Sequence, residues 1–239
     1  MLKWYQKLMA TLFVSFLLLA GCTDGQNIDD SNDLSWQKNF NLSKRTLTPT
    51  GRNQYFILEP GFQLVLGNRF TKLTITVLDE TKVINGVTTR VVEEKEWIRG
   101  EPYEVARNFF AIDDKTKDVF YFGEEVDFYK DGKIVDHSGA WIAGENGATA
   151  GLQMSGDPKV GMKYYQELAP NVAMDRAEII SVTDQLKTPA GNFSNCLTTK
   201  EGTALNFLEV EFKTYAPGIG LIQDESLLLT QYGFIKKDN

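Results

Sequence analysis

The sequence predicts a mainly β protein: a strongly curved antiparallel sheet, closed as a barrel or open as a half-barrel, with a long central loop and little helix outside the amino-terminal segment. Three observations predict this class. Apolar and polar residues alternate with a period of two in several short runs. Asn-Gly and Asp-Gly pairs separate such runs. No segment of the remaining chain has a long amphipathic helical stripe.

The first element is an apolar run behind a basic start. Lys3 and Lys7 precede 13 mostly apolar residues, from Leu8 to Ala20. As a helix this run would reach about 20 Å, less than the roughly 30 Å hydrocarbon core of a membrane. The layout is that of a secretory signal peptide, so we expect residues 1–21 to be an export signal that is removed.

The end of this run, Leu19-Ala20-Gly21-Cys22, resembles the lipobox of bacterial lipoprotein precursors. The resemblance implies cleavage before Cys22 and lipidation of its thiol and new amino group, hence a membrane partner through acyl chains such as palmitate. The residue after the cysteine is Thr23 and not Asp, which implies the periplasmic face of the outer membrane if the host is Gram-negative. The alternative is a soluble secreted protein whose first cysteine is accidental.

The next stretch, residues 22–45, is polar and rich in Asn, Asp and Ser, which predicts a tether with order only near Trp36 and Phe40. Residues 46–239 then form a single β-rich domain, because their length and apolar content suit one core.

Within that domain the run "KLTITVL" places Leu73, Ile75 and Val77 on one face of a strand, which we expect to be the interior. Asn85-Gly86 predicts a tight two-residue hairpin turn, and Asp131-Gly132 predicts another. A third turn is expected at residues 113–118.

The carboxyl-terminal part continues with short strands. In "LEVEF" the apolar residues Leu208, Val210 and Phe212 alternate with Glu209 and Glu211, and we expect the apolar set to line the interior. Between them and the first hairpins, residues 140–170 contain five glycines, at 144, 147, 151, 156 and 161. We therefore expect the long central loop there.

Charge and cysteine content limit the function. Without Lys3 and Lys7 the mature chain has 23 basic and 32 acidic residues, a net charge of 23 − 32 = −9. An acidic surface repels phosphate backbones, so nucleic acid is not an expected partner. With Cys22 lipidated, Cys196 has no partner for a disulfide, and we expect a buried, poorly reactive thiol.

Motifs for metal or nucleophilic chemistry are weak. His137 is the single histidine, which excludes sites that need two imidazoles, and Asp136-His137-Ser138 projects to alternating faces of a strand and not to one triad. An EF-hand loop starting at Asp127 would lack its final carboxylate. A calcium site of another kind, within residues 124–131, is left open. We assign no catalytic residue, metal ligand or cofactor.

Several blocks, "FYFGEEVDFYKDGK", "GAWIAGENGA", "YYQELAP", "TPAGNFSNCL" and "YAPGIGLI", occur in this order. Together they resemble a family of uncharacterised bacterial envelope proteins, commonly secreted or lipidated, over roughly residues 90–230. The resemblance implies an envelope location and no particular chemistry.

We therefore expect a membrane-anchored envelope lipoprotein with a non-catalytic binding or structural role, whose partner is another envelope protein or an apolar ligand. The alternative is an envelope enzyme that uses carboxylates, with Glu145, Glu167 and Asp175 as candidate acids. The candidate ligand or partner loop consists of Trp141, Glu145, Tyr164, Tyr165 and Glu167.

Overall fold

The computed structural model describes residues 36–235; the predicted signal peptide, Cys22 and the first part of the predicted tether lie outside the described residues. One compact unit begins at Trp36. No helix in the described part of the chain is long and apolar enough to span a membrane. The elements are the short 3-10 helix η2 (Leu42–Lys44) and the strands β1 (Leu47–Thr48), β2 (Gly51–Asn53), β3 (Phe56–Leu58), β4 (Phe62–Gly67), β5 (Thr71–Ile84), β6 (Val87–Ile98), β7 (Glu101–Asp113), β8 (Val119–Lys130), β9 (Lys133–Asp136), β10 (Trp141–Ile142), β11 (Thr149–Met154), β12 (Lys163–Tyr165), β13 (Glu167–Leu168), β14 (Asp175–Thr188), β15 (Gly191–Thr203), β16 (Asn206–Ala216), β17 (Gly220–Asp224) and β18 (Leu227–Phe234).

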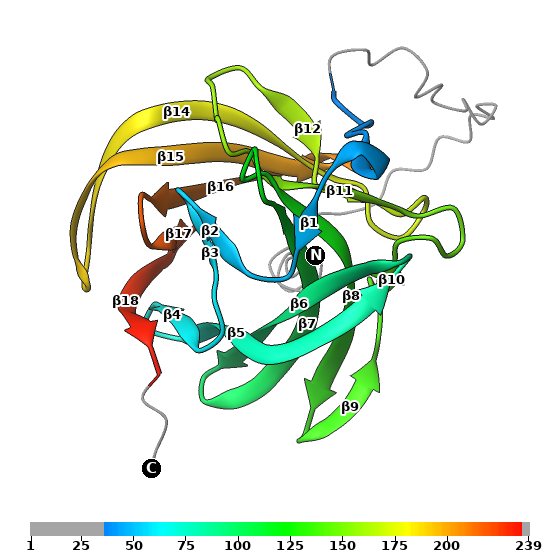
Figure 1. The fold of residues 1–239 in the computed structure, drawn as a ribbon. Coiled ribbons are helices and arrows are strands. Elements are labelled where there is room, and N and C mark those ends of the chain that lie inside the picture. The colour runs from blue at the N-terminus through cyan, green and yellow to red at the C-terminus, as the bar shows by residue number, and fades with distance from the viewer. Residues whose placement is uncertain (1–35, 236–239) are drawn as a thin grey trace, which may run out of the picture. The chain divides into compact units, whose positions relative to one another are not determined.

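These strands form an almost closed antiparallel barrel, which confirms the predicted fold class (Figure 1). The order around the sheet is β12-β14-β15-β16-β17-β18-β4-β5-β6-β7-β8-β11-β13. The two ends of this order are consecutive in sequence, since only Gln166 separates β12 from β13. Because β12 pairs with β14 and β13 pairs with β11, this short segment joins the two edges of the sheet.

The predicted hairpin turns are confirmed. Asn85 and Gly86 both have positive φ, at 47° and 79°, and connect Ile84 of β5 directly to Val87 of β6. Such a turn has the twist that matches two antiparallel strands. Asp131-Gly132 connects β8 to β9 in the same way. The turn between β7 and β8 is held by Asp113, whose carboxylate accepts hydrogen bonds from the backbone amides of Lys115 and Thr116.

The alternation of apolar and polar residues predicted the buried face correctly in β5 but not in β16. In β5, Leu73 and Val77 are buried and Ile75 is partly buried in the core, as predicted. In β16 the prediction is wrong: Leu208, Val210 and Phe212 are 74%, 40% and 49% exposed, and the charged residues Glu209, Glu211 and Lys213 that alternate with them are less exposed. Alternation determines which residues share a face, whereas pairing with the rest of the barrel determines which face lies inside.

The predicted long central loop is not formed. Residues 140–170 contain the four short strands β10 to β13 instead. One of the glycines in this stretch serves close packing: a Cβ on Gly151 of β11 would lie 2.3 Å from the carbonyl oxygen of Gln166. The glycines that suggested a loop therefore include one that lets two backbones approach where the barrel closes.

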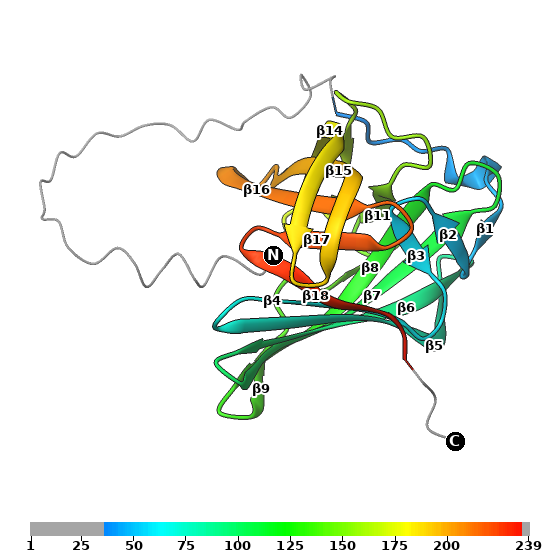
Figure 2. The same ribbon diagram turned by 90° about the vertical axis from the view of Figure 1, so that its left-hand side faces the viewer.

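One end of the barrel is covered by the hairpin of β2 and β3, which forms a separate two-stranded sheet (Figure 2). Asn53 fixes this hairpin, because its side-chain amide donates to the carbonyl oxygens of Lys117 and Ser155 at 2.8 and 2.9 Å. Ile57 and Leu58 of β3 are buried. The hairpin thus covers one end of the barrel with apolar side chains.

The start of the described chain also packs on the barrel. Gln37 forms a parallel bridge with Tyr164, and Phe40 is buried against Phe120. Arg45 pairs with Asp113 and Asp118 at 3.3 and 2.7 Å. The order expected near Trp36 and Phe40 is therefore present within the segment assigned to the tether.

Cys196 lies on β15 and is fully buried, with its thiol free. Burial raises the pKa of this thiol, and the nearby Asp184 carboxylate raises it further. Since the thiolate is the reactive form, the position predicts a poorly reactive cysteine.

Candidate functional site

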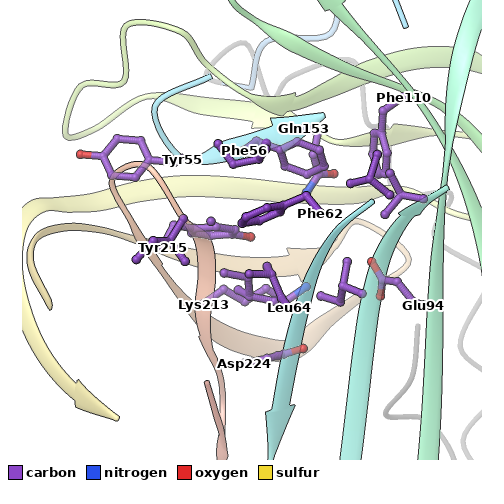
Figure 3. Close-up of a pocket in the computed structure, with 17 residues that line it drawn as sticks. Tyr55, Phe56, Phe62, Leu64, Glu94, Phe110, Gln153, Lys213, Tyr215 and Asp224 are labelled. Atoms are coloured by element: carbon purple, nitrogen blue, oxygen red, sulfur yellow. The ribbon is translucent and has the colours of Figure 1, made fainter. Parts of the chain in front are cut away.

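A cavity of about 90 Å³ lies inside the barrel, beside the hairpin of β2 and β3 (Figure 3). That space holds several ordered waters or one small molecule, and it is much smaller than the roughly 300–1,000 Å³ of pockets for drug-sized ligands. Its lining comes from strands far apart in sequence, from β3 to β17. The cavity therefore exists only in the closed barrel.

One wall of the cavity is aromatic. Phe56 of β3 and Phe110 of β7 meet edge to face with ring centroids 5.1 Å apart, and Phe110 stacks on Tyr121 at 4.7 Å. Phe62 also lines the cavity, and Figure 3 shows Phe56 and Phe110 in the upper part of the view with Lys213 and Asp224 below them. Ring pairs of this kind are rigid, so this wall offers a fixed apolar surface to a ligand.

The opposite wall contains a buried ion pair. The Lys213 ammonium on β16 lies 3.1 Å from a carboxylate oxygen of Glu201 on β15. Thr199 and Tyr215 donate hydrogen bonds to the other oxygen of Glu201. Burial disfavours the charged ammonium, but Glu201 and Asp224 outweigh burial and raise the pKa of Lys213 well above its ordinary value. Lys213 therefore remains a cation inside the barrel.

Glu94 on β6 faces the same cavity (Figure 3). Burial raises the pKa of Glu94; Lys213 partly opposes this effect, and Asp224 adds to it. A carboxyl in this position remains protonated to higher pH than one in solvent. It can donate a hydrogen bond when protonated and accept a cation when ionised.

A second set of carboxyls lies deeper on β7, β8 and β13. We call Glu104, Glu124 and Glu167 the inner acids. They are 8%, 7% and 8% exposed, and in the described part of the chain each has an oxygen without a hydrogen-bond partner. Burial, followed by neighbouring carboxylates, raises the pKa of all three, to about 8 for Glu104. The inner acids are thus held largely neutral where solvent is scarce.

Trp141 of β10 belongs to the same region. It pairs across the sheet with Glu124, which places the two side chains on one face, and its ring meets Tyr121 edge to face at 5.4 Å. The indole nitrogen of Trp141 is buried without a hydrogen-bond partner among the described residues. The indole N–H of Trp141 and one carboxyl oxygen of Glu124, both without a hydrogen-bond partner among the described residues, therefore lie on the same face of the sheet.

The residues predicted for a ligand loop lie mostly in short strands, and Tyr164 and Tyr165, which are consecutive on β12, project to opposite faces of the sheet. Trp141, Tyr164, Tyr165 and Glu167 are buried on β10, β12 and β13. Tyr165 meets Trp36 edge to face, and Tyr164 pairs with Ala177 across the sheet. Glu145 is different: it lies exposed in the turn between β10 and β11 and does not reach the interior.

The acidic stretch considered for calcium does not converge. Glu124 is buried and Glu125 is exposed, because consecutive strand residues point to opposite faces. Asp127 pairs with His137 at 2.9 Å. Among the described residues no three histidine, cysteine or carboxylate side chains are placed to hold a metal ion.

No motif in the sequence singled out Lys213, Glu94, Glu104 or Asp224. One signal was present in "LEVEFK", because Lys213 continues the alternation of Glu209 and Glu211. That alternation defines two faces, and only the apolar face was considered as the interior.

Comparison of the chain with models of protein families, with curated proteins and with solved structures finds no match. The case for a function therefore rests on the geometry of the barrel interior.

Proposed function

We propose that this protein is a lipid-anchored bacterial envelope protein whose barrel binds, without catalysis, a small ligand that combines an apolar group with a cationic or hydrogen-bond-donating group. The observation that carries the proposal is the cavity in which the aromatic wall of Phe56 and Phe110 faces Glu94 and Asp224. Aromatic surface with a few convergent polar groups is typical of small-molecule sites.

The chemistry of the polar wall favours a donor over an anion. Lys213 pairs with Glu201, and Asp224 is a second acidic group acting on it, so this wall offers no unpaired cation to an anionic ligand. Glu94, which burial keeps protonated to higher pH, can donate a hydrogen bond or, once ionised, accept a cation. An amine can replace the proton that Glu94 otherwise retains.

A non-catalytic role is supported by the placement of the acids considered for an enzyme. Glu145 lies exposed in a turn, whereas Glu167 and Asp175 lie on β13 and β14 within the barrel wall. General acid-base chemistry needs its groups within hydrogen-bond reach of one substrate. Glu167 and Asp175 lie close enough for their carboxyls to interact, but Glu145 is apart from them, so the three carboxyls do not form one set.

The ligand proposal is tested with benzylamine, benzyl alcohol and benzoate, which share a ring and differ in charge. Thermal unfolding of the purified protein should shift to higher temperature with benzylamine, less with benzyl alcohol and not with benzoate. Glu94→Gln should remove the preference for the amine. Glu93→Gln is the matched control, because Glu93 directly precedes Glu94 on β6 and pairs instead with Lys95 at 2.7 Å. Equal shifts with amine and benzoate would contradict the proposal.

The anchor is tested separately at Cys22, which lies outside the described residues. Cells that express the chain are labelled with a fatty acid, and the protein is isolated. The wild-type chain should carry the label and Cys22→Ala should not. Equal labelling of the two chains would exclude lipidation at this cysteine.

A further inference from the structure

The outer face of β16 and the turn before it carry exposed apolar side chains, which we call the β16 ridge. Single exposed apolar residues are common on proteins, but a contiguous set indicates an interaction surface. The members are Leu205 in the turn and Leu208, Val210 and Phe212 on the strand, which are 51%, 74%, 40% and 49% exposed. Phe207, which is 76% exposed, alternates with them and projects to the other face of β16.

The ridge is exposed because the hairpin of β15 and β16 extends beyond its neighbour. β16 pairs with β17 only from Lys213 onward, so residues 206–212 have β15 on one side and no ladder with β17 on the other. Figure 2 shows this end of β16 projecting at the left-hand side of the barrel. The ridge is therefore accessible to a large, flat partner.

Cations lie beside the ridge on the same outer surface. Lys200 of β15 is exposed and is the direct cross-strand partner of Phe212, so the two side chains share a face. One strand further, the Arg176 guanidinium of β14 lies 4.5 Å from the ring centre of Trp36, and the Lys163 ammonium lies 5.6 Å from it. Glu178 of β14 lies among these cations: it pairs with Lys163 at 3.7 Å and is the cross-strand partner of Lys200. With three cations and one carboxylate the group is still basic, and apolar side chains beside a basic group match the surface of an anionic bilayer.

Trp36, the first described residue, lies close to this surface. Trp36 lies against Arg176 on β14, and only β15 separates β14 from β16, a distance of about 10 Å between strands. Cys22 precedes Trp36 by 36 − 22 = 14 residues, which span at most about 45 Å when extended. An anchor at Cys22 would thus hold the outer face of β14 to β16 near the membrane.

We propose that the β16 ridge docks onto the surface of an anionic phospholipid bilayer, with its apolar side chains among the headgroups and Lys200 and Arg176 against lipid phosphates. This inference rests on the proposed membrane anchor. The local cations are needed because the mature chain, at −9, would otherwise be repelled by such a surface. Docking would fix the orientation of the barrel on the membrane.

The test uses the mature chain, residues 22–239, made without lipid. Its Cys22 thiol is coupled to a maleimide phospholipid in vesicles of phosphatidylethanolamine and phosphatidylglycerol, while the buried Cys196 is spared. A second sample has Cys22 capped by a soluble maleimide. Hydrogen–deuterium exchange of the two samples is then compared for residues 203–212 and for residues 80–88. The second segment contains Val83, which is 68% exposed and serves as the matched control.

Coupling to vesicles should slow exchange in residues 203–212 and leave residues 80–88 unchanged. Leu208→Asp should abolish the slowing and Val83→Asp should keep it; Leu205→Asp repeats the test at a second exposed position. Unchanged exchange in residues 203–212 overturns the proposal. Equal slowing in the capped, vesicle-free sample at high concentration also overturns it, because the ridge would then join two copies of the chain. Since the coupling is chemical, either result is independent of whether cells lipidate Cys22.

Discussion

The inner acids should lower the free energy of unfolding as pH rises, and Glu104→Gln should reduce this pH dependence. Glu104 is 8% exposed, and its carboxyl has an oxygen without a hydrogen-bond partner in the described part of the chain. Burial raises its pKa from 4.5 to about 8 in the folded state. The unfolded chain releases this proton near the ordinary value. The stability that depends on this group is therefore complete below about pH 4.5 and is lost as pH rises to about 8.

The size of the effect follows from proton linkage. Between pH 5 and pH 7 the folded state holds about one more proton on Glu104 than the unfolded state does. Each bound proton changes the free energy of unfolding by about 1.4 kcal/mol per pH unit, so this group alone should lower it by about 2–3 kcal/mol over the interval. Glu124 and Glu167, whose pKa values are also raised by burial, add to the same trend.

The measurement is urea unfolding followed by tryptophan fluorescence at pH 5, 6, 7 and 8. Wild-type protein should lose stability from pH 5 to pH 7, and Glu104→Gln should reduce that slope by about one proton. Glu101→Gln is the control, because Glu101 lies on the same strand and is exposed. If wild-type stability is constant or rises over this interval, or if Glu104→Gln has the wild-type slope, the inner acids are not held neutral.

Three further predictions follow from burial and pairing. Lys213→Met should lower the free energy of unfolding by about 2–4 kcal/mol, because it leaves Glu201 buried without a cation. Urea unfolding at neutral pH measures this loss. An unchanged free energy would show that the ion pair does not stabilise the fold. Cys196 should react with a thiol reagent much faster in denatured than in native protein, whereas rapid native labelling would show that it is accessible. Val210→Asp, on the exposed face of β16, should change the free energy of unfolding by less than about 1 kcal/mol. Val77→Asp, in the core, should lower it by more than about 3 kcal/mol. Similar losses for the two variants would mean that both side chains face the core.

Local sequence was sufficient for the class of fold and for its tight turns. Asn85-Gly86 and Asp131-Gly132 occupy the positive-φ positions that a two-residue hairpin requires, and few other residue pairs adopt them readily. Alternation in β5 correctly assigned Leu73 and Val77 to the interior. In "KLTITV" the other face carries a lysine and two threonines, so only one face of that run was apolar.

The candidate site was only partly predictable. Trp141, Tyr164, Tyr165 and Glu167 were selected as loop residues, and the structure places them in short strands of the barrel wall. Glycines such as Gly151 suggested a loop because sequence does not distinguish a glycine needed for a turn from one needed for close backbone approach.

Local sequence was therefore enough for the tight turns and for the sets of strand residues that share a face, since these depend on backbone geometry over a few neighbouring residues, but not for the strands within residues 140–170. Which face of β16 is the less exposed one depends on its partners in the barrel. Glu201 of β15 and Asp224 of β17 place countercharges beside Lys213, and this compensation lets the charged face be partly covered while Leu208, Val210 and Phe212 remain exposed. Partners this far apart in sequence meet only when the barrel closes, so no local pattern could reveal the ion pair, the cavity or the apolar ridge.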